Sequence, residues 1–201
     1  MNENIEFYNE HAKEFFESTL QTDMSRWRNK FEGYVINGGR ILDAGCGSGR
    51  DSKAFISDGF KVTAIDASVE LCKLAEEYIG QKVYNILFED ISFSQEYDGI
   101  WACASLLHVE NNHMSQVMKK ISNALVSNGV IYASFKYGDG ITLKGERSFY
   151  NFTEETVKDL FNNAGISIEE CSISADVREG RGDEKWVNVI GRKNIKEDII
   201  M

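Results

Sequence analysis

Proline is absent from the 201-residue chain, and histidine and cysteine are scarce, with three and four copies. Without proline the strongest marker of turns is missing, so element boundaries are taken from glycine, asparagine, aspartate and serine. The four cysteines lie far apart and form no C-x-x-C pair, which argues against a zinc site and against a disulfide framework. We expect them to be small buried apolar side chains, and we expect no bound metal.

Long apolar runs and a surplus of basic residues are missing as well. No run of about eighteen apolar residues occurs, so no transmembrane helix is expected, and the polar N-terminus lacks the features of a signal peptide. The formal charge of −10 weakens long-range attraction to nucleic acid or to an anionic membrane. We therefore expect a cytoplasmic protein, a monomer or homodimer, whose partner is a small molecule instead of a nucleic acid or a membrane.

Strand-like and helix-like segments alternate along most of the chain. The expected strands are residues 40–43, 60–65, 82–88, 99–104, 130–135, 167–173 and 186–191. Apolar residues at helical spacing separate them, and Ser68 and Thr153 are expected to cap two of the helices. This alternation predicts one α/β domain with a mostly parallel sheet covered by helices on both faces. Helices are also expected near residues 5–16 and 24–34, ahead of the first strand.

Three features follow the first three expected strands, at the edge where open α/β sheets bind their ligands. The first is the turn Asp-Ala-Gly-Cys-Gly-Ser-Gly at 43–49, whose glycines let the backbone approach a ligand closely. The second is Asp66, which can accept both hydroxyls of a ribose. The third is Glu89-Asp90, where a carboxylate and the adjacent backbone can read the amino group of an adenine. A tight turn, a helix cap and an exposed acidic loop are the simpler readings, but the spacing of about one β-α unit favours a single nucleoside site.

A nicotinamide dehydrogenase is the nearest rival. Its fingerprint G-x-G-x-x-G holds a pyrophosphate at the start of a helix. In this chain the third glycine, Gly49, comes one residue early, and Arg50 stands where the fingerprint has glycine. Asp43 would also repel a pyrophosphate, whereas it suits a ligand that carries an ammonium and a sulfonium group. S-adenosylmethionine has both and has no phosphate.

The segment Ile41-Leu-Asp-Ala-Gly-Cys-Gly-Ser-Gly49 resembles motif I of the class I S-adenosylmethionine-dependent methyltransferases. Asp66, Glu89-Asp90 and the segment Trp101–His108 match later landmarks of that family in order, so the resemblance covers residues 35–193. The segments Ala104–Val109, Phe135–Gly138 and Trp186–Asn188 are similar to small bacterial methyltransferases grouped with tellurite-resistance and small-molecule enzymes.

The resemblance implies a Rossmann-like fold with a seven-stranded sheet in the order 3-2-1-4-5-7-6 and strand 7 antiparallel. It implies S-adenosylmethionine as cofactor, with S-adenosylhomocysteine as product, and in-line displacement of the methyl group with the protein orienting the reactants. The cofactor positions carried over from the family are Asp43, Ala44, Gly45, Cys46, Gly47, Asp66, Ala67, Glu89, Asp90, Ile91, Ala104 and Ser105.

His108 is the candidate catalytic residue, as a base that takes a proton from the acceptor, with local packing as the alternative. The resemblance also implies that residues 1–34 form a helical lid over the cofactor, with 35–193 as the core and 194–201 as a loose tail. Tyr8 and Phe15 are the aromatic lid candidates, although such side chains are also typical of a core. Lys136 and Tyr137 begin a glycine-rich segment, 136–147, which is either a mobile acceptor loop or a plain surface hairpin.

The leading functional hypothesis is methyl transfer to a small-molecule acceptor. An RNA methyltransferase, for example one acting on tRNA, is the first alternative, and it would need a basic face or a further binding domain. A catalytically silent cofactor-binding regulatory subunit is the second. The sequence does not name the acceptor, because one fold supports many reactions.

Overall fold

A computed structural model describes residues 3–178 and 180–195 of the chain. Residues 196–201 of the expected tail lie outside these ranges. The helices are α1 (Glu3–Glu10), α2 (Ala12–Leu20), α3 (Ser25–Glu32), α4 (Arg50–Ser57), α5 (Val69–Ile79), α6 (Asn111–Ala124) and α7 (Glu154–Asn163), with short 3-10 turns at Phe88–Asp90 and Leu106–His108. The strands are β1 (Arg40–Ala44), β2 (Lys61–Asp66), β3 (Val83–Asn85), β4 (Tyr97–Ala102), β5 (Leu125–Lys136), β6 (Ile141–Lys144), β7 (Arg147–Tyr150), β8 (Ile166–Ala175) and β9 (Lys185–Lys193).

Seven strands form one sheet in the order β3-β2-β1-β4-β5-β9-β8. The first five are parallel, and β9 runs antiparallel to both β5 and β8. Because β6 and β7 form a separate two-stranded hairpin, β8 and β9 are the sixth and seventh strands of the sheet itself. The predicted Rossmann-like fold and its strand order are therefore confirmed.

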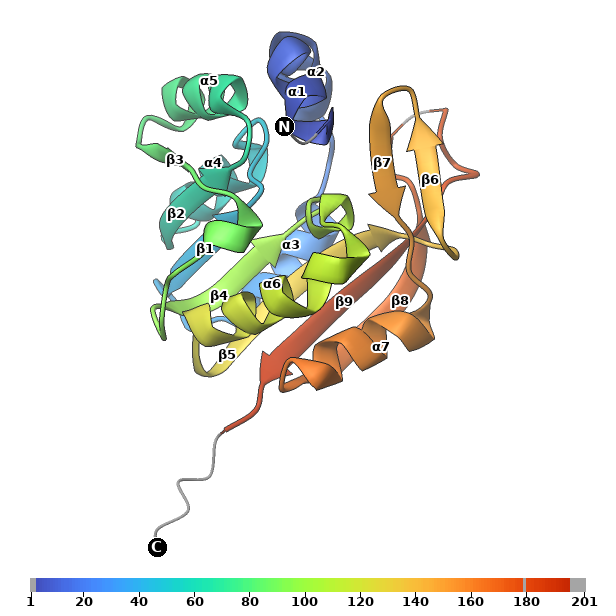
Figure 1. Ribbon diagram of the computed structural model, residues 1–201. Coiled ribbons are helices and arrows are strands. Elements are labelled where there is room, and N and C mark those ends of the chain that lie inside the picture. The colour runs from blue at the N-terminus through green and yellow to red at the C-terminus, as the bar shows by residue number, and fades with distance from the viewer. Residues whose placement is uncertain (1–2, 179, 196–201) are drawn as a thin grey trace, which may run out of the picture.

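Apolar side chains on both faces of the sheet are covered by helices. On one face, α6 and α7 bury residues such as Val117, Ile121 and Phe161. On the other, α3 and α4 surround Trp101, which is stacked on Tyr132 with the ring centroids 4.0 Å apart. Figure 1 shows α6 and α7 on the near face and α3 behind the sheet. Because α3 belongs to this core, the lid hypothesis is limited to residues 3–20.

The capping residues expected from the sequence lie at the starts of α5 and α7. The Ser68 hydroxyl accepts a hydrogen bond from the backbone N–H of Leu71, and α5 ends at Gly80, whose φ is +76°. The hydroxyl of Thr153 caps α7 and forms a reciprocal capping box with Thr156. Both caps were expected, because each residue type satisfies an N–H group that the first helical turn leaves unpaired.

Several element boundaries differ from those expected. The N-terminal helix is interrupted at His11, so that α1 and α2 are separate. The third strand is only Val83–Asn85, and the chain then leaves the sheet edge toward the 3-10 turn at Phe88–Asp90. Helix α6 passes directly into β5 at Leu125, ahead of the expected stop at Asn128-Gly129. The glycine-rich segment is the β6–β7 hairpin, which was the plain alternative to a loop.

A helix can cross a bilayer only if it is both long enough and sufficiently apolar. Across residues 3–178 and 180–195, no helix is both long enough and apolar enough to cross a bilayer.

Candidate functional site

A cavity of about 260 Å³ lies at the carboxyl ends of β1, β2, β4 and β5. Residues from α1, α2, the hairpin and the β8–β9 connection complete its walls. Figure 1 shows α1 and α2 above this edge of the sheet, between α5 and the hairpin. Ligands of open α/β sheets bind at this edge, so the cavity is the candidate site. We call its β1–β2 side the cofactor end and its hairpin side the acceptor end.

The glycine turn between β1 and α4 forms the floor of the cofactor end. Gly45 and Gly47 both have positive φ, at +80° and +54°. A Cβ atom on Gly45 would lie 2.4 Å from the Cβ of Ser105, and one on Gly47 would lie 3.1 Å from the ring of Phe15. Both positions therefore require glycine, for backbone conformation and for space.

Asp66, at the end of β2, holds this turn in place. Its Oδ2 accepts a hydrogen bond of 2.8 Å from the N–H of Gly47, and its Oδ1 accepts one of 2.9 Å from the N–H of Ser68. Burial raises the pKa of this carboxyl, and the two N–H donors oppose that shift. Since a carboxylate has about four lone-pair positions, Asp66 retains acceptor capacity toward the cavity that it lines.

Asp43, the last acidic residue of β1, is only 2% exposed and accepts a 2.6 Å hydrogen bond from the Ser52 hydroxyl. Burial raises its pKa to about 7, with a further increase from the nearby Asp51 carboxylate. A cation in the cavity would favour the ionised form of this group. Asp43 lines the cavity beside the glycine turn, so a positively charged ligand suits this end.

Arg50 and Asp51, the first residues of α4, were not predicted as site residues. Asp51 is 5% exposed, and its Oδ2 accepts a 3.0 Å hydrogen bond from the indole N–H of Trp101. The guanidinium of Arg50 donates to both oxygens of Asp51, at 3.0 and 2.6 Å. The signal available in the sequence was the position of this Arg-Asp pair directly after Gly49. A charged pair that directly follows a ligand-binding turn is a candidate for the site.

The loop after β4 forms the wall between the two ends. Ala104 has a φ of +52°, which is strained for a residue with a side chain, and its N–H donates to the Ser134 hydroxyl at 2.9 Å. The Ser105 hydroxyl donates to the carbonyl of Ala44 at 2.7 Å. These bonds fix the loop against β1 and β5, and both residues, which the sequence predicts as cofactor contacts, line the cavity.

The remaining cofactor candidates divide into two groups. Cys46, Ala67 and Glu89 line the cavity. The cavity wall does not include Ala44, Asp90 or Ile91: Ala44 and Ile91 are core residues, and the Asp90 side chain is exposed.

Tyr8 and His108 meet at the acceptor end, although they are 100 positions apart. The Nδ1 of His108 lies 3.0 Å from the carbonyl oxygen of Ser148, and its Nε2 lies 3.0 Å from the Tyr8 hydroxyl. A carbonyl only accepts, so Nδ1 carries the proton and Nε2 accepts from Tyr8. Burial, together with the charges of Arg147 and Lys136, lowers the pKa of His108 to about 4.

The hairpin and the ends of β5 and β9 supply the rest of the acceptor end. Lys136 lines the cavity, whereas Tyr137 is 41% exposed and is not part of its wall. The additional lining residues there, beyond those predicted individually, are Lys144, Arg147, Phe149, Arg178, Arg181 and Trp186. Sequence reasoning flagged 136–147 as a segment, but it did not single out these side chains, because only the folded hairpin turns β7 toward the cavity.

The comparisons agree with this geometry. A family model described as a methyltransferase domain matches residues 41–129. A methyltransferase of uncharacterised function from Staphylococcus carnosus is 27% identical over 190 residues, which is 82% of this chain and 91% of the relative. A ubiquinone biosynthesis O-methyltransferase from Rickettsia bellii is 27% identical over 168 residues, covering 73% of this chain and 68% of the relative.

Among solved structures, the chain is similar to a 1,6-didemethyltoxoflavin-N1-methyltransferase from Burkholderia thailandensis, which holds 1,6-didemethyltoxoflavin and S-adenosylhomocysteine. The TM-score is 0.78 at 19% identity, over 96% of this chain and 86% of the other, so this likeness concerns the fold. No relative named here is a tellurite-resistance enzyme, and that finer resemblance is not confirmed. The strand order, the glycine turn with its acidic partners and the methyltransferase domain matched at residues 41–129 together support a class I S-adenosylmethionine-dependent methyltransferase.

Proposed function

We propose that the chain transfers the methyl group of S-adenosylmethionine to a small-molecule acceptor. The observation that carries this proposal is the enclosure of the acceptor end, which has α1, the hairpin and the β8–β9 connection as its walls. A single cavity of about 260 Å³ shared by both ends favours a compact acceptor over a folded RNA. The net charge of −10 supports the same choice, because an RNA-binding face needs an excess of basic residues.

The residues at the cofactor end fit S-adenosylmethionine. The glycine turn leaves space that a Cβ atom would fill, and the buried carboxyl of Asp43 suits a cationic ligand. We assign the ribose hydroxyls to Asp66, the adenine side to Glu89, and the positively charged methionine part to the turn beside Asp43. When bound, the cofactor supplies a methyl group activated by its sulfonium charge. The protein's own contribution is to orient the acceptor and to exclude water.

The surroundings of His108 favour a positioning role over the expected role as a base. An imidazole with a pKa of about 4 is a weak base, and its Nε2 lone pair is already occupied by the Tyr8 hydroxyl. A third positive charge, on His108, would be opposed by both Arg147 and Lys136. We propose that His108 orients Tyr8, whose hydroxyl lines the acceptor end, and that the acceptor needs no base from this residue.

We propose that α1 and α2 form a lid over the cavity. Among residues 3–20, only Asn4 and Ala12 are buried, so little apolar burial stabilises these helices when the cavity holds no ligand. Their inner face meets the site directly: the Tyr8 and Phe15 rings lie 5.0 Å apart, and the Thr19 hydroxyl donates to that of Ser48 at 3.0 Å. A ligand that bridges these helices and the glycine turn would therefore order them.

The proposed function is tested by methyl-labelled S-adenosylmethionine with a low-mass metabolite extract in one reaction and bulk tRNA in another. We expect label in a low-mass product, which mass spectrometry then identifies, and none in tRNA. Label confined to tRNA would reverse the choice of acceptor. Binding of S-adenosylhomocysteine with no labelled product in either reaction would favour the silent regulatory subunit.

Asp66→Ala is expected to weaken binding of S-adenosylhomocysteine by about 1.5–3 kcal/mol, because two ribose hydroxyls lose a charged acceptor. Isothermal titration calorimetry measures this change, and Asp66→Asn should lose less because an amide oxygen remains. Asp159→Ala, on the exposed face of α7, is the matched control and should bind as the wild type does. Unfolding curves for each variant show whether the glycine turn survives. An unchanged affinity for Asp66→Ala would remove this carboxylate from the cofactor site.

His108→Gln is expected to lower turnover less than about tenfold, whereas loss of a general base typically costs about 10²–10⁴-fold. The measurement is label transfer to the extract between pH 5.5 and 8.5. The wild type should show no His108-dependent decline toward the acidic side of this range, because a pKa lowered to about 4 keeps the imidazole neutral throughout. His108→Ala, which cannot orient Tyr8, should lose more than the glutamine variant. A decline near pH 6–7 that disappears in His108→Gln, with a hundredfold loss, would restore the role as a base.

The lid proposal predicts slower amide hydrogen exchange over residues 3–20 when S-adenosylhomocysteine is added. Exchange in α7, which lies away from the cavity, serves as the internal reference and should change little. Removal of residues 1–20 should reduce turnover far more than it reduces cofactor affinity. Slow exchange of this segment without ligand would show instead that α1 and α2 are docked structural elements.

A further inference from the structure

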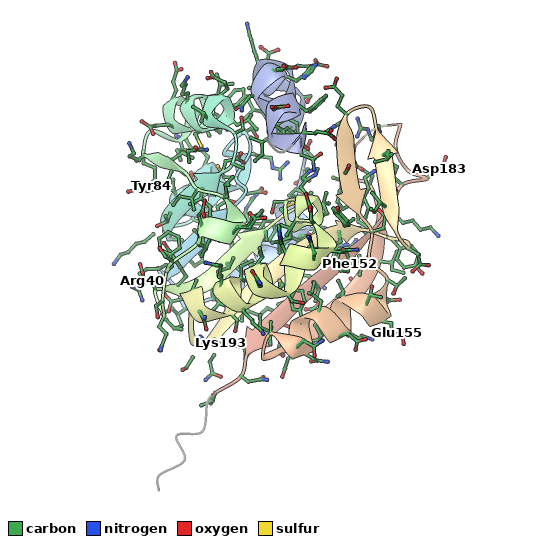
Figure 2. The ribbon with its side chains drawn as sticks, in the orientation of Figure 1. Arg40, Tyr84, Phe152, Glu155, Asp183 and Lys193 are labelled. Atoms are coloured by element: carbon green, nitrogen blue, oxygen red, sulfur yellow. The ribbon has the colours of Figure 1, made fainter. Side chains whose placement is uncertain are left out.

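Basic side chains gather at the acceptor end of a chain that is acidic as a whole. The basic residues that line it are Lys136 at the end of β5, Lys144 and Arg147 on the hairpin, and Arg178 and Arg181 in the β8–β9 connection. In Figure 1 the hairpin and this connection lie side by side beyond the ends of β5 and β9, and Figure 2 labels Asp183 in the same region. These residues come from three separate stretches of sequence, and the fold brings them to one place.

Acidic partners at this end leave part of the positive charge uncompensated. Asp176 accepts a hydrogen bond of 2.9 Å from the Nε of Arg178. Glu184 accepts from both Lys136, at 2.7 Å, and Lys144, at 3.3 Å. Within residues 3–178 and 180–195, no carboxylate lies within 4.0 Å of the guanidinium nitrogens of Arg147. The acceptor end therefore carries a net positive charge among the described residues.

Arg147 has one buried donor atom that the described fold leaves without a partner. Its guanidinium carbon lies 4.4 Å from the ring centroid of Phe7 and 5.4 Å from that of Phe149. Its Nε is buried and has no hydrogen-bond partner in the described structure. A buried donor without a partner destabilises the protein, and an acceptor atom of a ligand would remove this cost. A guanidinium held between rings presents its planar fork to a planar anion such as a carboxylate.

The opposite end of the cavity has the opposite charge. Its lining carboxylates are Asp43, Asp51, Asp66 and Glu89, and the basic residue among them, Arg50, is bound to Asp51. A cavity that is acidic at one end and basic at the other separates two ligands of opposite charge. The cationic cofactor fits the first end, so an anionic acceptor fits the second.

The apolar walls of the acceptor end are aromatic. The Nζ of Lys136 lies 4.9 Å from the ring centroid of Phe149 and 5.9 Å from that of Trp186. The indole N–H of Trp186 donates to Asp176 at 3.0 Å, which fixes this ring in place, and Tyr8 contributes a third ring. Flat rings at fixed positions favour a flat ligand, because stacking adds to the area buried.

We infer that the methyl acceptor is a small aromatic carboxylate whose carboxylate binds the guanidinium of Arg147 and whose ring lies against Phe149 and Trp186. The carboxylate is the recognition group, and the methyl group goes to another atom of the acceptor. This inference rests on the proposed function, since it names the class of molecule that occupies the acceptor end. It also accounts for a site in which His108 is held neutral, because an anionic ligand is stabilised by the surrounding cations without a further charge on the imidazole.

Three probes that share one ring and differ in charge test this inference: indole-3-acetate, indole-3-acetamide and tryptamine. Each is titrated by calorimetry into protein saturated with S-adenosylhomocysteine. We expect indole-3-acetate to bind at least tenfold more tightly than tryptamine, with the amide between them, and to weaken as salt is raised. Arg147→Gln should lose at least tenfold in affinity for indole-3-acetate while its affinity for the amide changes less than twofold. Arg147→Lys, which keeps the charge and loses the fork, should fall between.

Arg40→Gln is the matched control, because Arg40 begins β1 at the end of the sheet away from α1 and should leave the binding of all three probes unchanged (Figure 2). Tryptamine or the amide binding as tightly as indole-3-acetate would overturn the inference, and so would an Arg147→Gln variant with wild-type affinity or a wild type that binds no indole-3-acetate. The S-adenosylhomocysteine affinity, measured first for each protein, separates this failure from that of the proposed function. A wild type that binds no S-adenosylhomocysteine overturns both.

Discussion

The carboxylate of Asp66 joins the two segments on which the cofactor end depends. One oxygen holds the N–H of Gly47 in the glycine turn, and the other holds the N–H of Ser68 at the start of α5. The turn has positive φ at Gly45, Gly47 and Gly49. Glycine adopts positive and negative φ about equally readily, so the turn does not favour this conformation by itself. The buried carboxylate supplies the fixed acceptor that selects this conformation, and the close contact of Gly45 with Ser105 then sets the position of the loop after β4.

The same arrangement has a cost that folding alone does not explain. Asp43, Asp51 and Asp66 are carboxyl groups removed from water in one small region, and burial raises the pKa of Asp43 to about 7. Ala104 adds backbone strain at the edge of the same cavity. Buried like charges and strained residues of this kind concentrate at functional sites, where a ligand compensates them. The unpartnered Nε of Arg147 is the corresponding feature of opposite sign at the acceptor end.

The sequence predicts the sheet and the caps of two helices well because their signals are local. Each strand is an apolar run bounded by turns, and Ser68 and Thr153 are caps that act within one helical turn. The short length of β3 was missed, because the length of an edge strand depends on how far it pairs with its one neighbour, here β2, and its own composition does not show this. The interruption at His11 was missed too, because residues 5–16 have helical spacing throughout. In the fold, α1 packs against α5 and β7, and α2 packs against α5.

The acceptor end was predictable only in outline. Tyr8, His108 and Arg147 lie in three distant parts of the chain, and no short-range pattern relates them. His108 was recognised from its place after β4, but its environment comes from the hairpin and from α1, so its low pKa and its bond to Tyr8 were outside the reach of sequence reasoning. Asp90, Ile91 and Ala44 show the converse limit, since a family motif marks a segment while the cavity is lined by particular side chains of that segment.

Helix α1 connects the two ends of the cavity. Near its start, Asn4 exchanges hydrogen bonds with the backbone of Ser148 on β7, through its amide nitrogen at 3.2 Å and its amide oxygen at 2.9 Å. Near its end, the amide oxygen of Asn9 accepts from the hydroxyl of Ser68 at 2.8 Å, and the N–H of the same Ser68 is held by Asp66. A displacement of α1 that opens one end therefore breaks contacts at the other. Under the lid proposal, entry and departure of the two ligands would share a single gate, and the residence time of the spent cofactor would be tied to the release of the methylated product.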